Sequence, residues 1–364
     1  METKLLNGNN KEAIAEASKI LQDGGLVAFP TETVYGLGAD ALNADAAAKI
    51  YAAKGRPSDN PLIVHIADTD AVEKLADLET MNRTHPDMVK KAHMLMEAFW
   101  PGPLTIIFPK LAIVPDGTTG GLPTVAIRMP SHPIAQELIR TSGVSIAAPS
   151  ANTSGRPSPT TAQHVWEDMD GRIEMILDGG AVGIGIESTI VDMTGTIPTI
   201  LRPGFITKTM LSEIVGDVTI DPAIIEPDPN LRPKAPGMKY THYAPHGTLS
   251  IVEAVADESA NRASLHSGVK VSYNATEAET LRVAEKIKAL VNEKEAQGYK
   301  VAILTTKEHA SLYKNYSHVL IVGEGSKGQT ISARLYAALR ECDSEQMEYM
   351  YSEAFDQNEL GGAI

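Results

Sequence analysis

The chain has 364 residues, of which 43% are hydrophobic and 21% charged, a composition typical of a folded globular protein and not of a disordered one. Its length predicts two or three domains, and 46 acidic against 32 basic residues give a net charge of −14. This acidity, already −8 within residues 1–215, disfavours a dedicated nucleic-acid binder, which needs basic surface to neutralise phosphates. A single cysteine and the lack of a signal peptide or a long apolar run predict a cytoplasmic protein without a disulfide or membrane span.

Helical and strand patterns alternate through the first two hundred residues. Apolar residues at helical spacing over 13–21 stop at Gly24 and Gly25, and a short apolar run follows over 26–29. Further helices are predicted near 44–53, 86–99, 133–141 and 160–169, and strands over 62–66, 104–108, 124–129, 145–148, 175–177, 189–192 and 199–201. Short, fully apolar strands between helices predict a sheet covered by helices.

The sequence changes character at about residue 216. Residues 216–246 contain six prolines and almost no periodicity, which indicates a linker. Beyond it, strands are predicted over 249–254, 269–273, 301–305 and 319–322, and helices over 277–297 and 331–342. This alternation predicts a small doubly wound α/β domain. The expected domains are therefore 1–215, the linker 216–246, and 247–364.

Several short patterns that often mark nucleotide or metal sites are weak evidence in this sequence. Residues 323–328 fit G-x-G-x-x-G, but a dinucleotide fingerprint also needs a following strand with an acidic residue, and we expect a plain strand-to-helix turn. His242 and His246 are four apart, but Pro245 prevents a helix that would align them as metal ligands. Cys342 has no histidine nearby in the sequence, and no Walker-type phosphate loop occurs.

A denser set of polar residues follows the predicted strands of the first half. Lys54 and Arg56, separated by one glycine, are typical of an anion site, although as isolated surface charges they would be inert. Arg128 lies inside an apolar run, where a charge is costly unless a protein group or a ligand carboxylate pairs with it. Ser150 and Asn152 follow another apolar strand, at the kind of position where α/β proteins bind ligands.

These motifs resemble those of the threonylcarbamoyl-AMP synthases. They occur in the family's order: PTETVYGLG (30–38), KGRP with NPL (54–62), WPGPLT (100–105), VAIRMP (125–130), PSAN (149–152), ESTIVD (187–192) and LRPG (201–204). Residues 235–245 are similar to the linker of the long, two-domain form, whereas 247–364 match in layout only. The resemblance implies a YrdC-like twisted mixed sheet covered by helices, plus a smaller Rossmann-like C-terminal α/β domain.

The resemblance also implies a reaction, in which L-threonine, bicarbonate or CO2 and ATP give threonylcarbamoyl-AMP and pyrophosphate. Magnesium would assist, held mainly by the ATP phosphates and not by side chains. The product would pass to a separate tRNA threonylcarbamoyltransferase for the threonylcarbamoyladenosine modification. The implied site residues are Lys54, Arg56, Ser150 and Asn152 as the catalytic quartet; Thr33, His65, Arg128, Ala148 and Ser188 for L-threonine; and Arg56, Asn60, Thr124, Ser150, Ser158, Arg202 and Tyr240 for ATP.

Two further expectations concern the linker and the end of the chain. Because Tyr240 lies in the proline-rich stretch, we expect the linker to close over the nucleotide and to exclude water from the labile mixed anhydride. Long-form members carry a closing G-x-A-x-x-N-R segment, whereas this sequence stops at Ile364, so we expect the terminal domain to lack its last helix.

Two alternative functions are weighed against this one. An RNA-binding or ribosome-maturation module could use the same fold, but the acidity of residues 1–215 counts against it. A carbamoyl-phosphate-using enzyme would need a zinc-finger region, which one cysteine cannot supply. The sequence leaves the oligomeric state and the identity of any general base undetermined.

Overall fold

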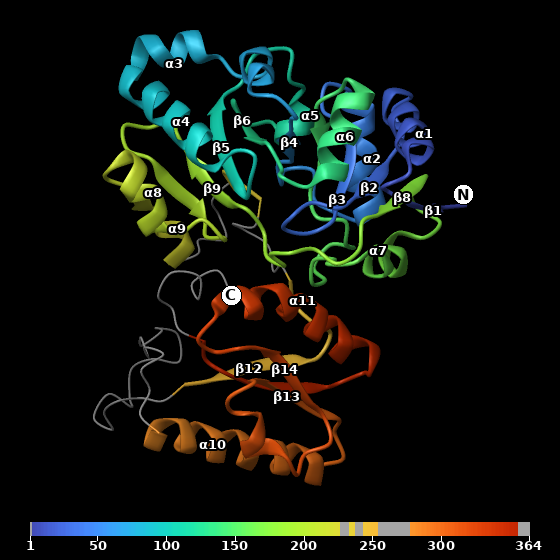
Figure 1. Ribbon diagram of the computed structural model, residues 1–364, viewed down its shortest axis with the longest axis vertical. Coiled ribbons are helices and arrows are strands. Elements are labelled where there is room, and N and C mark those ends of the chain that lie inside the picture. The colour runs from blue at the N-terminus through green and yellow to red at the C-terminus, as the bar shows by residue number, and fades with distance from the viewer. Residues whose placement is uncertain (1, 226–232, 237–242, 254–276, 356–364) are drawn as a thin grey trace. The chain divides into compact units, whose positions relative to one another are not determined.

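The computed structural model describes residues 2–225, 233–236, 243–253 and 277–355. The chain divides into two compact units, Met1–Tyr243 and Ala244–Ile364, and Figure 1 shows the elements of each. Tyr240 and the predicted strand 269–273 lie outside the described residues. No helix of the described part is long and apolar enough to cross a membrane, and the cytoplasmic location stays a prediction.

The first unit is a mixed sheet with helices on both faces. Its strands are β1 (Lys4–Asn7), β2 (Val27–Phe29), β3 (Gly36–Asp40), β4 (Ile63–His65), β5 (Leu104–Pro109), β6 (Thr124–Arg128), β7 (Ile146–Ala147), β8 (Met175–Asp178), β9 (Thr189–Asp192), β10 (Thr199–Arg202) and β11 (Thr219–Ile220). Its helices are α1 (Lys11–Gln22), α2 (Ala44–Lys54), α3 (Leu78–Thr84), α4 (Pro86–Phe99), α5 (Asp116–Thr119), α6 (Pro133–Ser142), α7 (Ala162–Met169), α8 (Lys208–Val215) and α9 (Pro222–Ile225), with a 3-10 turn, η1, over Thr69–Lys74.

Within the described residues these strands form one sheet in the order β1-β8-β2-β3-β7-β4-β6-β5-β9-β10-β11. Its centre combines both pairing directions, because β4 pairs with β6 in parallel and with β7 in antiparallel fashion. In this register His65 of β4 lies beside both Arg128 of β6 and Ile146 of β7. The topology therefore brings His65 and Arg128, which lie far apart in the sequence, to one end of neighbouring strands.

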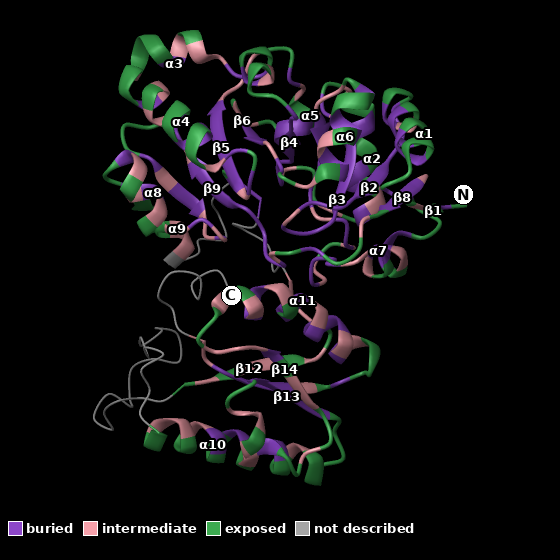
Figure 2. Cartoon of the chain, in the orientation of Figure 1, coloured by how far each residue is buried: buried purple, intermediate pink, exposed green. Residues whose placement is uncertain are grey.

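The two faces of this sheet bury different sets of side chains. Val27 and Phe29 pack with α1 and α6, whereas Ala28 between them belongs to the larger cluster on the other face. This period of two is what a strand buried on both faces requires. Helices α2, α4, α7 and α8 contribute to the larger cluster, and Figure 2 shows the central strands of the sheet as mostly buried.

Caps at the helix ends explain several boundaries. The Asn10 side chain accepts the backbone N–H of Glu12 at the start of α1, and Asn43 caps α2 in the same way. Helix α2 ends at Lys54, and the next residue, Gly55, has a φ of 64°, a left-handed conformation that favours glycine. This turn directs the chain straight from Lys54 to Arg56, two of the predicted site residues.

The second unit is a parallel sheet between two helices (Figure 1). Its described strands, β12 (Thr248–Val252), β13 (Val301–Thr306), β14 (Val319–Gly323) and β15 (Tyr349–Glu353), are ordered β12-β15-β13-β14. Its helices are α10 (Glu277–Ala296) and α11 (Gly328–Ser344), with a 3-10 turn, η3, over Ala310–Tyr313. Val301 and Ile303 of β13 pack with α10 in the core of this unit.

The glycine-rich segment 323–328 joins β14 to α11 as the expected strand-to-helix turn. The sequence reasoning missed strand β15, which follows α11 and ends at the acidic Glu353. This strand pairs with β12 and β13 and not with β14. The Glu353 carboxylate accepts hydrogen bonds from the Thr305 hydroxyl at 3.0 Å and the Thr306 N–H at 2.8 Å. It therefore joins the ends of β15 and β13.

Candidate active site

A cavity of about 670 Å³, including its open mouth, lies in the first unit where several strands end. Its wall combines residues that follow β2 and β7, residues at the ends of β4, β6 and β10, and residues that precede β9. The lining residues are Thr31, Thr33, Val34, Gly36, Lys54, Arg56, Ile63, His65, Arg128, Ala148, Pro149, Ser150, Asn152, Ser154, Gly155, Glu187, Ser188, Arg202, Pro236 and Tyr243.

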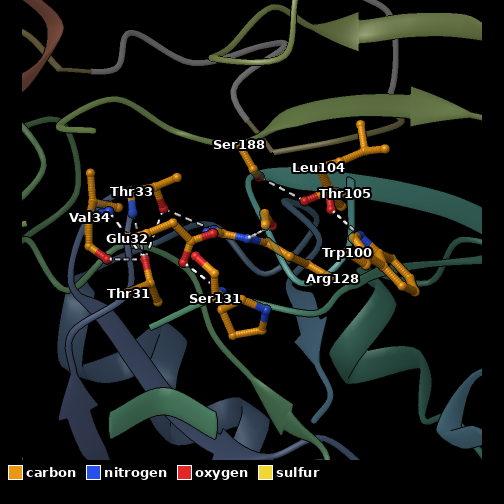
Figure 3. A network of polar contacts seen from close by, with 12 residues as sticks. Thr31, Glu32, Thr33, Val34, Trp100, Leu104, Thr105, Arg128, Ser131 and Ser188 are labelled. Atoms are coloured by element: carbon orange, nitrogen blue, oxygen red, sulfur yellow. Dashed lines mark hydrogen bonds and ion pairs between the residues drawn. The ribbon is translucent and has the colours of Figure 1, made fainter. Parts of the chain in front are cut away.

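Arg128 is held in the cavity wall by three kinds of acceptor (Figure 3). Its Nε donates to the Gly102 carbonyl at 3.3 Å, Nη1 to the Thr33 hydroxyl at 2.9 Å, and Nη2 to Glu32 Oε1 at 2.5 Å. The other oxygen of Glu32 accepts the Ser131 N–H at 3.1 Å. The buried charge that the sequence left unexplained is thus paired by a carboxylate of the protein itself.

The hydrogen bonds of the Thr33 hydroxyl fix which of its roles, donor or acceptor, is left for a ligand. Thr31 Oγ1 donates its one proton to the Val34 carbonyl at 2.6 Å, so in the 2.9 Å contact between the two hydroxyls Thr33 is the donor. Thr33 Oγ1 meanwhile accepts from Arg128. Toward a ligand, Thr33 can therefore act only as an acceptor, which suits an ammonium or a hydroxyl group.

Ser188 lies at the same end of the sheet. Its hydroxyl is 2.7 Å from the Thr105 hydroxyl and accepts from Arg202 Nη2 at 3.1 Å. Thr105 is fully buried, and giving its proton to Ser188 satisfies it. Ser188 then retains a proton that it can donate to a ligand carboxylate.

His65 is a neutral side chain in this wall. Burial, and after it the nearby positive charge of Arg128, lower its pKa to about 3. The Ile63 carbonyl, 3.1 Å from Nδ1, would favour the charged form but does not outweigh burial. So weak a base cannot take a proton from an ammonium group at neutral pH.

Lys54 joins the end of α2 to the loop after β7. Its ammonium donates to the backbone carbonyls of Ser150 and Asn152, each at 2.5 Å. The Ser150 hydroxyl donates to Asn152 Oδ1 at 2.6 Å, and the Asn152 amide donates to the Arg156 carbonyl at 2.9 Å. The predicted catalytic residues of this loop are therefore one hydrogen-bonded group organised around the Lys54 charge.

Two arginines and a tyrosine form another part of the wall. Arg56 donates from Nε to the Asn60 carbonyl at 3.3 Å and from Nη2 to the Pro61 carbonyl at 3.1 Å. Burial lowers the pKa of Arg56 to about 10, which leaves it cationic at neutral pH. Arg202 hydrogen-bonds Tyr243, whose pKa is raised first by burial and then by the negative charge of Glu187. These cations suit an anionic ligand such as a triphosphate.

Ten of the predicted site residues line the cavity, and the others are placed differently. The cavity is lined by all five residues predicted for L-threonine, which are Thr33, His65, Arg128, Ala148 and Ser188. It is also lined by five residues predicted for catalysis or ATP, which are Lys54, Arg56, Ser150, Asn152 and Arg202. Asn60, Thr124 and Ser158 are not among the described residues of the wall. Asn60 is buried behind Arg56, Thr124 begins β6 whereas Arg128 ends it, and Ser158 donates to Glu187 at 2.5 Å.

Comparison with known proteins identifies the family. A family model described as "Telomere recombination" matches residues 19–204, and one described as "Threonylcarbamoyl-AMP synthase, C-terminal domain" matches 206–364. A threonylcarbamoyl-AMP synthase of Bacillus subtilis is 45% identical over 356 residues, which is 98% of this chain and 91% of the relative. The chain belongs to the threonylcarbamoyl-AMP synthase family.

The archaeal relatives extend this result. The threonylcarbamoyl-AMP synthase of Pyrococcus abyssi is 40% identical over 361 residues, 98% of this chain and 94% of that protein. The crystal structure of P. abyssi Sua5 complexed with L-threonine matches with a TM-score of 0.84 and 39% identity, covering all of this chain and 95% of that one. The long two-domain family, the fold class and the threonylcarbamoyl-AMP synthase function predicted from the sequence are thereby confirmed.

The sequence reasoning missed several residues of the site. Glu187 and Tyr243 line the cavity, and Glu32 pairs with Arg128 from behind it. Glu32 and Glu187 both occur inside motifs that were recognised, so an acidic residue next to a candidate hydroxyl was the available signal. Pro236 and Tyr243 place two residues of the proline-rich stretch in the wall.

The lowered pKa of His65 predicts a loss of stability in acid. Because the unfolded chain takes up a proton below about pH 6.5 and the folded chain does not, the free energy of unfolding should fall by about 1.4 kcal/mol per pH unit between pH 6 and pH 4. His65→Gln should remove this contribution. Both tryptophans, Trp100 and Trp166, belong to the first unit, so urea unfolding followed by their fluorescence measures it. Equal pH dependence in the two proteins would contradict a neutral His65.

Proposed function

We propose that the chain is an ATP-dependent nucleotidyltransferase that converts L-threonine, bicarbonate or CO2 and ATP into threonylcarbamoyl-AMP and pyrophosphate. The observation that carries this proposal is one cavity that combines an arginine suited to a carboxylate with a separate set of cations suited to phosphates. The family to which the chain belongs supports the same reaction.

The threonine end of the cavity is proposed to be Arg128 with its neighbours. Arg128 would receive the substrate carboxylate, assisted by the Ser188 hydroxyl, and Thr33 would accept from the ammonium or the side-chain hydroxyl. Neutral His65 would add a polar contact without a competing positive charge. Ala148 is buried and supplies a small apolar wall of the kind that a methyl group needs. The relative P. abyssi Sua5 has been crystallised with L-threonine, which supports this type of ligand.

The ATP end is proposed to comprise Arg56, Arg202 and the loop held by Lys54. Arg56 and Arg202 would neutralise phosphate charge, and the Lys54 ammonium adds positive charge at the loop that carries Ser150 and Asn152. Asn60 has a buried Oδ1 without a partner among the described residues, and it stays a predicted ATP contact. Thr124, Ser158 and Tyr240 stay predicted ATP contacts. Pro236 and Tyr243 in the wall support a linker that excludes water from the site.

The chemistry requires positioning more than a protein nucleophile. The deprotonated threonine nitrogen attacks the carbon of CO2, or of bicarbonate with loss of water, and gives a carbamate. A carbamate oxygen then attacks the α-phosphorus of ATP, and pyrophosphate leaves with the electrons of the broken P–O bond. Magnesium would enter on the phosphates of ATP and supply further charge neutralisation. The product, a mixed anhydride, would be passed to a separate tRNA threonylcarbamoyltransferase.

Pyrophosphate release tests the proposed reaction. With ATP, bicarbonate and L-threonine all present, we expect pyrophosphate at a rate that disappears when any one of the three is left out. D-threonine provides a matched control, because it has the same groups in the wrong arrangement. Pyrophosphate that forms equally fast without L-threonine, or none in the complete mixture, would refute the proposal.

A further inference from the structure

The Glu32 carboxylate lies behind Arg128 and not in the cavity. Both neighbours of Glu32, Thr31 and Thr33, line the cavity, whereas Glu32 is not part of the described wall. Its side chain is only 13% exposed, and that of Arg128 is 4% exposed. Figure 3 shows the two side chains meeting end to end, with Ser131 at the far oxygen of Glu32. Glu32 therefore contacts the arginine without having to touch a ligand.

Among the described residues, the contacts of Arg128 use three of its guanidinium N–H groups and leave two for a ligand. A guanidinium has five N–H groups, and among the described residues three of the groups in Arg128 are used, one on each nitrogen. One N–H on each terminal nitrogen is left over. Two N–H groups on neighbouring nitrogens can bind a carboxylate with two hydrogen bonds.

We propose that Glu32 is a positioning residue for amino-acid recognition, holding the Arg128 guanidinium so that its two remaining N–H groups receive the substrate carboxylate. This inference rests on the proposed function, because it takes L-threonine as the ligand. Glu32 supplies both a counter-charge and a fixed acceptor, and its bond to Ser131 N–H fixes the acceptor in turn.

Preorganisation is the physical reason for such a residue. An arginine side chain has several rotatable bonds, and ordering it at the moment of binding costs affinity. Glu32 and Thr33 together orient the terminal nitrogens before a ligand arrives. A buried arginine without a counter-charge would also be costly in the ligand-free protein, and would turn toward other acceptors.

A purely electrostatic role for Glu32 predicts the opposite sign. If the carboxylate only reduced the positive potential at Arg128, removing its charge would strengthen the binding of a substrate carboxylate. Positioning predicts instead that binding weakens when the charge is removed while the size of the side chain is kept. The direction of the change therefore distinguishes the two roles.

Glu32→Gln is the variant that tests the proposal. We expect the KM for L-threonine to rise about tenfold, the KM for ATP to stay within about threefold, and kcat at saturating L-threonine to stay within about threefold. Glu174→Gln is a matched control, because the Glu174 carboxylate accepts the Leu26 N–H at 2.8 Å and does not line the cavity. It should leave all three constants unchanged.

A ligand without the carboxylate isolates the effect further. L-Threoninol retains the amine and the side-chain hydroxyl but has a neutral CH2OH group in place of the carboxylate, which cannot accept two charge-assisted hydrogen bonds from Arg128. Its inhibition constant should therefore change by less than about twofold between Glu32→Gln and the unmodified chain. Calorimetric binding of L-threonine in the absence of ATP should show the same tenfold loss in the variant.

Three outcomes would overturn the inference. They are an unchanged or lowered KM for L-threonine in Glu32→Gln, equal losses for L-threonine and ATP, and an equal loss for L-threoninol. Failure of the proposed function has a different signature. In that case the unmodified chain would release no threonine-dependent pyrophosphate, whereas calorimetry would still report whether Glu32 controls the binding of L-threonine.

Discussion

Replacement of Arg128 by alanine should raise the KM for L-threonine at least about 100-fold while the KM for ATP changes by less than about threefold. Truncating one partner of a buried, hydrogen-bonded charge pair in a complex costs about 2–5 kcal/mol of binding free energy, and here the lost partner is the proposed ligand of the substrate carboxylate. Steady-state pyrophosphate release at varied L-threonine and varied ATP measures both constants. An equal rise in the two KM values would mean that Arg128 does not bind the amino acid.

Stability has to be separated from recognition in this experiment, because Glu32 loses its counter-charge. Arg128→Lys keeps the charge near Glu32 but loses the fork of two N–H groups, so it should fold and still raise the KM for L-threonine more than tenfold. Arg140 is the matched control. It donates to the Ala67 carbonyl at 3.3 Å, does not line the cavity, and its replacement by alanine should leave both KM values unchanged.

Replacement of Lys54 by methionine should reduce kcat/KM by about a thousandfold and destabilise the first unit. Loss of a preorganised charge in a site costs about 10²–10³ in rate, and here the loop that carries Ser150 and Asn152 also loses its anchor. The backbone carbonyls of Ser150 and Asn152, which accept hydrogen bonds from Lys54, would lose this donor. The loss costs about 2–4 kcal/mol of unfolding free energy.

Lys49→Met is the control for this prediction. Lys49 lies in the same helix, α2, and its ammonium also donates to a backbone carbonyl, that of Gly24, at 2.6 Å. It does not line the cavity, so its loss should cost at most about 1 kcal/mol of stability and leave kcat/KM unchanged. A Lys54→Met protein as active as Lys49→Met would show that the Lys54 charge is not needed at the site.

The regular elements could be predicted from the sequence wherever the apolar pattern was strong. Helix α4 and strands β5 and β8 were expected almost at their observed bounds. Strand β3 was missed because Gly36 and Gly38 weaken a strand pattern. The structure gives the reason for Gly38, because a Cβ atom there would come within 2.6 Å of Ile146 and 2.8 Å of Phe29.

The site could be predicted from motifs but its connections could not. The motifs identified the residues that line the cavity, yet the pairing of Glu32 with Arg128 joins positions 96 residues apart. That contact depends on the register that places the end of β6 beside the loop after β2, which periodicity does not reveal. For the same reason the sequence predicted Lys54 at an anion site but did not reveal that its ammonium donates to the carbonyls of a distant loop.

The glycine of the LRPG motif (201–204) is required by packing. A Cβ atom on Gly204 would lie 2.5 Å from the Thr189 nitrogen and 2.6 Å from the Glu187 carbonyl oxygen. Only glycine allows this segment to lie directly against the backbone beside Ser188. The motif thereby helps to place Ser188 and Arg202 together, although neither Pro203 nor Gly204 lines the cavity.

Transfer of carbon from [14C]bicarbonate to an adenylate is the most direct test of the central claim, that one cavity joins L-threonine, CO2 and AMP. Incubation with ATP and L-threonine should give a labelled product that contains AMP, in an amount equal to the pyrophosphate released. Arg128→Ala should form little of it at limiting L-threonine. Pyrophosphate release without label in the adenylate, or labelled product without L-threonine, would contradict the account.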